Sequence, residues 1–254
     1  MKRFLLLFLL LGLVMTGQSQ IRTVVIDAGH GGKDPGCHGK LSKEKDVALK
    51  IALKTGELIK ENFPDVEVVY TRQEDIFVEL QERSAIANRV NADLFISIHC
   101  NAATSSKAHG TETYIMGMHK NDDNLAVAMR ENAAILQEEN YEERYESFNP
   151  NSMISYIRLA NYQSAFQANS AEFAREIEDQ FKNRVRRVSR GVKQSGFLVL
   201  WQTSMPSVLI EVGFLSNPTE ERYLNSSQGQ DYVASGIYRA FKSYKQAMEK
   251  TSAK

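Results

Sequence analysis

The chain has 254 residues, of which 43% are hydrophobic and 24% are charged, a composition typical of a globular protein with a sizeable core. This composition excludes a disordered tail, a coiled coil and a collagen-like fibre. The 31 basic and 31 acidic residues balance, so the chain lacks the positive field on which non-specific nucleic-acid binding relies. Cys37 and Cys100 are too few for a disulfide scaffold and lack the paired spacing of a structural zinc site.

The first 19 residues have the layout of a signal peptide: two basic residues, an apolar run at 4–15, and small residues at Gly17 and Ser19. A membrane-spanning helix needs roughly 20 apolar residues, so this run is too short for one. We predict cleavage near Ser19 and a periplasmic or secreted mature chain with no stable membrane insertion; an uncleaved amino-terminal anchor is the alternative. Removing residues 1–19 leaves a net charge of −2, so binding to an anionic envelope polymer requires a specific site.

Strand and helix patterns alternate along the mature chain. The segments with the composition of strands are 23–27, 66–71, 93–99, 111–116, 197–200 and 207–212. Apolar residues recur at helical spacing over 47–59, 78–90, 123–136, 171–185 and 228–248. This alternation predicts one α/β domain over residues 20–254 with largely parallel strands.

Two histidines and one acid come at the strand and helix ends where open α/β sheets bind ligands. His30 follows the first strand, His99 ends the third, and Glu44 begins the first helix on the face of its apolar residues. Two imidazoles and a carboxylate with one open position make a catalytic zinc site, in which the metal activates water and polarises a carbonyl. The pattern therefore predicts hydrolysis.

Glu211 interrupts the hydrophobic strand at 207–212, where a carboxylate is costly unless it is paired, hydrogen-bonded or engaged in proton transfer. It is our candidate for the group that moves the proton. Each of these residues also has a structural interpretation. The histidines fit ordinary hydrogen-bonded positions, Glu44 fits a solvated first-turn acid, and Glu211 fits a buried partner of an arginine such as Arg72 or Arg83.

Seven segments resemble a known family in order along nearly the whole mature chain. They are VVIDAGHGGKDPG (24–36), EKDVALKIALK (44–54), TRQEDIFVELQERSAIAN (71–88), ADLFISIHCNA (92–102), GTETYI (110–115), RGVKQSGFLVL (190–200) and PSVLIEVGFLSNPTEE (206–221). This set is similar to the zinc-dependent N-acetylmuramoyl-L-alanine amidases (Amidase_3 type) of bacterial cell-wall turnover. A motif set of this length is far more specific than one short pattern.

The resemblance implies a single α/β domain of the phosphorylase/hydrolase-like type, with a six-stranded, mostly parallel, twisted sheet flanked by helices. It implies one Zn²⁺ ion held by His30, Glu44 and His99, with Glu211 as the catalytic acid and base. The expected reaction is hydrolysis of the amide between N-acetylmuramic acid and L-alanine of peptidoglycan, for cell-wall remodelling or daughter-cell separation. The interpretation from the residues alone and the resemblance agree.

The tract around 131–169 lacks strong family motifs and is the candidate for a regulatory insertion. In some of these amidases a helix at this point covers the zinc cleft, carries an acid that reaches the metal, and is displaced by an activator protein. The acids that are candidates for this inhibitory role are Glu138, Glu139, Glu142, Glu143 and Glu146. A solvated acidic face is the simpler interpretation of the same run.

Three further residues flank the expected metal site. Asn101, two residues after His99, is a candidate for substrate contact, with an ordinary turn role as the alternative. Cys37 and Cys100 stand where the family usually has small uncharged residues. A disulfide between them and two independent small hydrophobic side chains both remain open.

Two rival functions fit parts of this pattern. Another zinc hydrolase of the envelope, such as a peptidase or a sugar deacetylase, shares the metal chemistry and differs in the pocket. A catalytically silent wall-binding or activating protein shares the fold, although all four candidate site residues are present here. The sequence shows no separate wall-binding module and does not define the oligomeric state.

Overall fold

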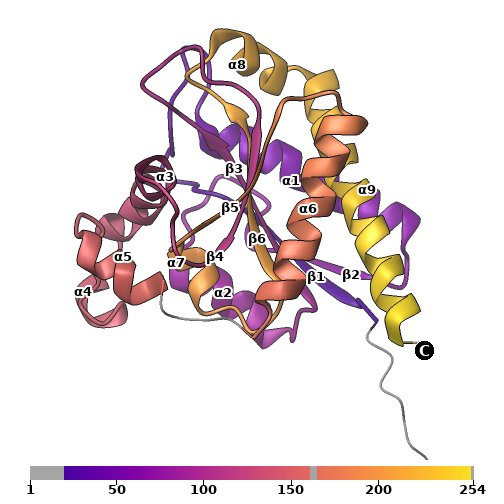
Figure 1. The fold of residues 1–254 in the computed structure, drawn as a ribbon, viewed down its shortest axis with the longest axis horizontal. Helices are drawn as coiled ribbons and strands as arrows, with labels where there is room; N and C mark the ends of the chain where they lie inside the picture. Colours follow the sequence, from indigo (N-terminus) through magenta and orange to yellow (C-terminus); the bar gives the residue numbers. More distant parts are fainter. Residues whose placement is uncertain (1–19, 161–164, 253–254) are drawn as a thin grey trace, which may run out of the picture.

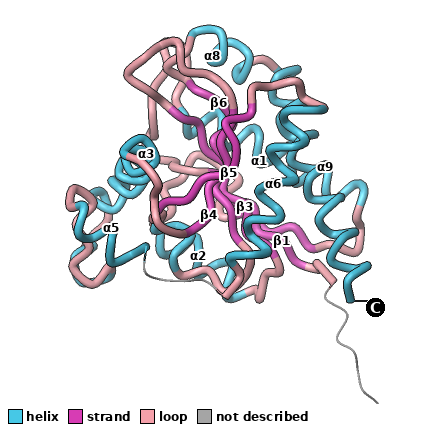
Figure 2. Tube along the Cα trace, viewed as in Figure 1, coloured by secondary structure: helices cyan, strands magenta, loops and turns pink. Residues whose placement is uncertain are grey.

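The computed structural model describes residues 20–160 and 165–252, so the predicted signal peptide lies outside the described residues. A six-stranded sheet runs through the centre of the molecule, with helices on both flanks (Figures 1 and 2). Its strands are β1 (Thr23–Ala28), β2 (Glu67–Tyr70), β3 (Leu94–Asn101), β4 (Thr111–Met116), β5 (Ser189–Ser195) and β6 (Ser207–Phe214). This architecture confirms the predicted fold class.

The strand order is β2-β1-β3-β6-β4-β5, and four of the five neighbouring pairs are parallel. The exception is β4, which runs antiparallel to β6 and brings Glu112 opposite Glu211. β3 and β6 occupy the middle of the sheet, and all residues of both strands are buried. The carboxyl ends of β1, β3 and β6 therefore lie at one edge of a rigid platform.

Helices cover both faces of the sheet. The helices are α1 (Glu44–Asn62), α2 (Leu80–Arg89), α3 (Asp122–Asn132), the short 3₁₀ helix η1 (Ala133–Gln137), α4 (Tyr141–Arg144), α5 (Met153–Ala160), α6 (Gln167–Asn183), α7 (Leu198–Trp201), α8 (Pro218–Asn225) and α9 (Ser227–Ser252). Figure 1 shows α6 and α9 side by side on one flank and α2, α3 and α5 on the other. None of the described helices combines the length and apolarity that crossing a membrane requires.

Alternation along the strands divides the core into two clusters, one on each face. In β3, Ile96 and Ile98 pack with residues of α1, α6 and α9, whereas Phe95 packs with residues of α2, α3 and α7. β6 follows the same rule, because Leu209 belongs to the second cluster. Since side chains alternate with a period of two, His99 and Glu211 project to the face of Phe95 and Leu209, toward α3.

One predicted strand is wrong. Residues 197–200 form most of the short helix α7, and the fifth strand is β5, at Ser189–Ser195. β5 is an edge strand whose residues are mostly half-buried and polar, so it lacks the apolar run by which a buried strand is recognised. Phe197 and Leu198 are apolar because they pack into the core beside β4. A short helix can bury such residues as well as a strand can, so the apolar run did not distinguish the two.

Candidate metal centre and active site

The loop after β1 carries His30 in a left-handed backbone conformation, with φ of 59°. Two buried arginines hold this loop by its carbonyl oxygens. Arg83 donates to the oxygens of Ala28 and His30 at 2.7 and 2.8 Å, and Arg72 donates to those of Ala28 and Gly29 at 2.9 and 2.7 Å. Arg72 and Arg83 therefore fix the loop, and the arginine that contacts Glu211 is Arg130, at 3.3 Å.

The His30 ring is oriented by Asp34, whose Oδ2 lies 2.7 Å from Nδ1. A carboxylate on one ring nitrogen sets the tautomer and leaves the other nitrogen as a ligand. That nitrogen, Nε2, lies 3.2 Å from Glu44 Oε1. It is buried and has no hydrogen-bond partner of acceptable geometry in the described part of the chain.

Glu44 is the first residue of α1 and is completely buried. Its carboxylate accepts hydrogen bonds from the backbone N–H groups of Cys37 and Cys100, both at 2.8 Å. Its Oε1 also lies 3.1 Å from Nδ1 of His99. These contacts stabilise the charged carboxylate, and its pKa lies below the ordinary value, although burial alone would raise it, because the His30 imidazole lies beside it.

His99 lies on β3 with its ring against the His30 loop, and the two imidazole centroids are 4.9 Å apart. A Cβ atom at Gly29 would lie 2.4 Å from Cε1 and Nε2 of His99, so only glycine leaves room for the ring. Burial lowers the pKa of His99, but the Glu131 and Glu44 carboxylates outweigh this effect and raise it to about 9. The imidazole therefore lies in a strongly negative environment that favours a cation.

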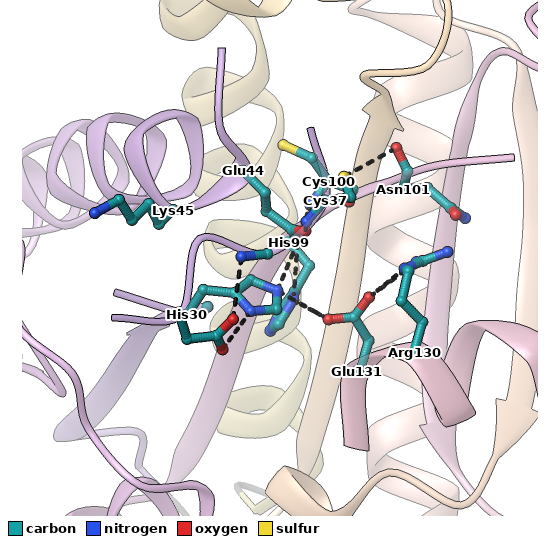
Figure 3. A network of polar contacts seen from close by, with 12 residues as sticks. His30, Cys37, Glu44, Lys45, His99, Cys100, Asn101, Arg130 and Glu131 are labelled. Carbon is teal, nitrogen blue, oxygen red and sulfur yellow. Dashed lines mark hydrogen bonds and ion pairs between the residues drawn. The ribbon is translucent and has the colours of Figure 1, made fainter. Parts of the chain in front are cut away.

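Glu131, near the carboxyl end of α3, completes the group. Its Oε2 lies 2.9 Å from His30 Nε2 and 3.0 Å from His99 Nδ1, and the candidate ligand atoms of His30, Glu44, His99 and Glu131 all lie within 4.8 Å of one another (Figure 3). Oε2 of Glu131, like Nε2 of His30, is buried without a hydrogen-bond partner among residues 20–160 and 165–252. With the His30 proton on Nδ1 toward Asp34, Nε2 of His30 and Oε2 of Glu131 both present lone pairs, as expected where one cation binds both atoms.

The donor set suits zinc. Imidazole nitrogens and carboxylate oxygens bind Zn²⁺ at about 2.0–2.2 Å in a tetrahedral arrangement. Neighbouring ligand atoms of such a tetrahedron are separated by roughly 3.3 Å, and the contacts among these four side chains are close to that value, at 2.9–3.2 Å. The residues therefore fit the ion that the sequence predicted, and Glu131 is an additional donor.

Glu211 lies beside this group on β6, paired in register with His99 of β3. Burial and the nearby Glu131 carboxylate hold the pKa of Glu211 well above its ordinary value, and the Arg130 guanidinium, 3.3 Å from Oε1, opposes this effect only in part. Its other oxygen, Oε2, is buried without a partner in the described residues. A carboxyl group with a raised pKa and a free oxygen can both accept and return a proton.

The acid that meets the metal-competent residues is Glu131 and not a member of the predicted acidic run. Glu138 is buried, but its oxygens accept from the N–H of Leu80 and the hydroxyl of Tyr145. The other four acids, Glu139, Glu142, Glu143 and Glu146, are exposed. One signal favoured Glu131: it shares a helix face with the apolar positions 127 and 128, and an acid on such a face needs a partner.

The remaining candidates lie close to the group. Asn101 is buried, and its Nδ2 donates to Glu112 Oε2 at 3.2 Å, so it is not a simple turn residue. Cys37 and Cys100 are both free, and Cys37 Sγ donates to the carbonyl oxygen of Cys100 at 3.1 Å. Burial raises the pKa of both thiols, so they behave as small, inert side chains that join the loop to β3.

Comparison with known proteins supports the same chemistry. The chain matches the N-acetylmuramoyl-L-alanine amidase family over residues 24–243. It is 34% identical over 233 residues to N-acetylmuramoyl-L-alanine amidase AmiC of Escherichia coli O6:H1, a match that covers 90% of this chain and 54% of AmiC. The chain thus spans about half the length of that relative.

Solved structures share the fold. The N-acetylmuramoyl-L-alanine amidase from Clostridium difficile 630 matches with a TM-score of 0.66 and 30% identity, covering 89% of this chain and 97% of that one. The CwlD amidase of Clostridioides difficile, solved in complex with the GerS lipoprotein, matches with a TM-score of 0.65 and 28% identity, covering 89% and 99%. Since the family match extends over most of the sequence and the fold agrees, this chain belongs to the N-acetylmuramoyl-L-alanine amidase family.

Proposed function

We propose that this chain is a zinc-dependent hydrolase of the amide bond between N-acetylmuramic acid and L-alanine of peptidoglycan. The observation that supports the proposal is the buried convergence of His30, Glu44, His99 and Glu131, with Glu211 adjacent on β6. His30, Glu44 and His99 would hold the ion. When bound, Zn²⁺ supplies a Lewis acid that polarises the amide carbonyl and lowers the pKa of water.

Glu211 is the group that moves the proton. Its raised pKa lets it take a proton from the attacking water and keep it until the carbon–nitrogen bond breaks. It then gives the proton to the departing nitrogen of L-alanine. Burial of Glu211 keeps bulk water from this exchange, and the sheet holds it beside His99 throughout.

The test is product analysis. Purified protein is incubated with peptidoglycan sacculi, with and without a chelator, and the soluble products are identified by mass spectrometry while zinc content is measured in parallel. We expect intact stem peptides with a free amine on L-alanine, and none after chelation. Cleavage within the peptide or loss of acetyl groups would show a peptidase or a deacetylase. No release by either the wild-type protein or its Glu131→Ala variant would indicate a silent wall-binding protein.

The arrangement of α3 supports a resting state in which the site is closed. Glu131 contacts the nitrogens of His30 and His99 that would hold the ion, and the neighbouring Arg130 contacts Glu211. We propose that Glu131 is the inhibitory acid and that the regulatory segment begins with α3. Substrate then reaches the site only after α3 moves.

An activator protein is the agent that we propose for this movement. Helix α5, in the same region of the chain, exposes three apolar side chains, Met153, Ile154 and Ile157, with exposed fractions of 55%, 63% and 43%. Exposed apolar side chains grouped on one helix are typical of a docking surface. The CwlD amidase was solved with a lipoprotein bound, and this complex supports a protein partner for the present chain as well. Replacing Ile154 with Asp should weaken activation without changing basal hydrolysis.

We further propose that residues 1–19 direct the chain across the membrane and are removed. Peptidoglycan lies outside the cytoplasm, so an enzyme that acts on it needs an export route. Amino-terminal sequencing of the mature protein from the periplasm or medium should give a first residue near Gln20. An intact amino terminus in the membrane fraction would show an anchor.

A further inference from the structure

A cleft of about 510 Å³ lies beside Glu211, on the side of β4 and β5. Its lining includes the basic side chains Arg190 and Lys193, together with Asn101 and the buried acid Glu112, and α3 contributes one further base, Arg130, and one further acid, Asp123. We call it the cationic pocket. Glu112 lies directly opposite Glu211 in the antiparallel pair of β4 and β6, so the pocket adjoins the residue to which we assign proton transfer.

Glu112 fixes the pocket wall and has no remaining acceptor to offer a ligand. Its Oε1 accepts from Arg190 Nε and from Lys193 Nζ, the latter at 2.7 Å. Its Oε2 accepts from the Tyr114 hydroxyl at 2.6 Å and from Asn101 Nδ2 at 3.2 Å. Although burial opposes ionisation, these donors keep the pKa of Glu112 below its ordinary value, so it is charged.

Arg190 and Lys193 together carry two positive charges, whereas Glu112 carries one negative charge, so one positive charge remains uncompensated within this group. Arg190 uses only Nε in hydrogen bonds to the described residues, so its two terminal nitrogens keep their donors free, and its guanidinium lies over the Phe214 ring. Lys193 lies near the Tyr114 ring. A guanidinium fixed at Nε, with its terminal N–H groups free, is well suited to bind a carboxylate through two parallel hydrogen bonds.

We propose that the cationic pocket binds a carboxylate of the stem peptide and thereby sets the direction in which peptidoglycan lies across the metal site. This inference rests on the proposed function. In intact substrate the glycan is uncharged, because its lactyl carboxyl group is the one joined to L-alanine. The stem peptide carries the negative charges, so a cationic pocket selects the peptide side of the scissile bond.

The nearest candidate group is the α-carboxylate of the second residue, D-glutamate, which continues the chain through its side chain. The leaving nitrogen belongs to the residue before it, and the pocket adjoins Glu211, which supplies that nitrogen with its proton in our proposal. A stem peptide in the pocket thus runs over β4 and β5. The glycan then lies on the opposite side of the metal residues, toward the loop after β1.

The experiment measures binding of two product peptides by calorimetry to the zinc-loaded protein. One has D-glutamate with a free α-carboxylate as its second residue, and the other has that carboxylate converted to the amide. Neither contains the scissile bond, so hydrolysis does not enter. We expect the free carboxylate to bind roughly tenfold more tightly, as a charge-assisted hydrogen-bond pair implies.

Arg190→Gln is expected to abolish that tenfold preference, and Arg190→Lys to restore part of it. The matched control is Arg175→Gln, which removes an exposed arginine of α6 on the other flank and should keep the preference. Equal affinity of the wild-type protein for both peptides, or an unchanged preference in Arg190→Gln with native circular dichroism, would overturn the inference.

Steady-state kinetics on muropeptides provide the second readout. Arg190→Gln should raise KM for the free-carboxylate substrate while leaving kcat nearly unchanged, since the pocket binds a part of the substrate that does not react. Release of stem peptides with equal KM for the free-carboxylate and amidated substrates would contradict carboxylate binding in the cationic pocket, and the proposed function would stand. Peptide discrimination in the binding assay without any release from sacculi would support the pocket and contradict the proposed function.

Discussion

His99 and Glu211 are lateral neighbours on adjacent parallel strands, paired in register between β3 and β6. Both side chains project to the face of the sheet that α3 covers. The spacing between the imidazole to which we assign metal binding and the carboxylate to which we assign proton transfer is therefore fixed by strand pairing in the buried centre of the sheet and not by a loop.

Glu211→Gln tests the role of this carboxylate. The amide keeps the size of the side chain but cannot carry the proton, so we expect normal zinc content, a normal fold and a loss of activity of about 10²–10⁴-fold. Zinc analysis, circular dichroism and stem-peptide release from sacculi measure the three properties. Release at the wild-type rate would show that Glu211 is not the general base.

His30→Ala and His99→Ala should each lose metal as well as activity. Removing an outer-shell partner typically weakens metal binding about 10- to 100-fold, and removing a ligand should cost at least as much. Zinc content after dialysis against a weak chelator is the measurement. His109→Ala is the control, because His109 is outside the metal-competent group and bonds only to the Lys107 carbonyl among the described residues. Full zinc retention in both variants would exclude this site.

Glu131→Ala should activate the enzyme in the absence of any partner. The variant removes the carboxylate that closes the site, and typical coupling energies of 1–3 kcal/mol correspond to a gain of about 5- to 150-fold in basal hydrolysis. Glu139→Ala is the control, since Glu139 is exposed and contacts none of the metal-competent residues. Lower activity in a folded, zinc-loaded Glu131→Ala protein would instead make Glu131 part of the machinery.

Arg83→Met should destabilise the fold and the His30 loop together. Arg83 is buried, pairs with Asp27 at 2.8 Å and donates to the Ala28 and His30 carbonyls. Breaking a buried pair costs about 3–5 kcal/mol, because it leaves an uncompensated charge. Chemical denaturation measures the loss. A loss of unfolding free energy below about 0.5 kcal/mol, as is typical of a surface substitution, would contradict the role of Arg83 in holding the His30 loop.

The Asp27 pair should also make stability depend on pH. Burial tends to raise the pKa of Asp27, but Arg83, Ser97 and Thr71 together lower it below its ordinary value. A carboxyl group with a lowered folded-state pKa contributes stability above its unfolded pKa, about 3.9, and loses that contribution as the pH falls through the folded pKa. The free-energy difference between wild type and Asp27→Asn should therefore be constant above pH 5 and shrink on acidification. A stability difference between the two proteins that grows as the pH falls would contradict a lowered pKa for Asp27.

The sequence was sufficient for the residues whose positions follow from strand and helix ends. His30, Glu44 and His99 could be brought together because parallel strands share one carboxyl edge and helical periodicity turns Glu44 inward. Glu211 was recognisable as a charge within an apolar strand. Each of these signals is local and needs no knowledge of distant packing.

The other site residues depend on packing that local patterns do not contain. Glu131 lies in a helix of ordinary composition, and only the tertiary packing of α3 brings it to His30 and His99. β5 is polar because it is an edge strand, so its pairing with β4 could not be read from hydrophobicity. The fixed guanidinium of Arg190 likewise depends on Glu112, 78 positions away in the chain.

The two contacts that we propose to be inhibitory come from consecutive residues of one helix. Arg130 contacts Glu211 and Glu131 contacts the two histidines, so a displacement of α3 away from the sheet releases both contacts together. Opening of the metal-competent residues and release of Glu211 from Arg130 then occur in a single step. Under the proposed regulation, the response of the enzyme to a partner that displaces α3 should therefore be all-or-none.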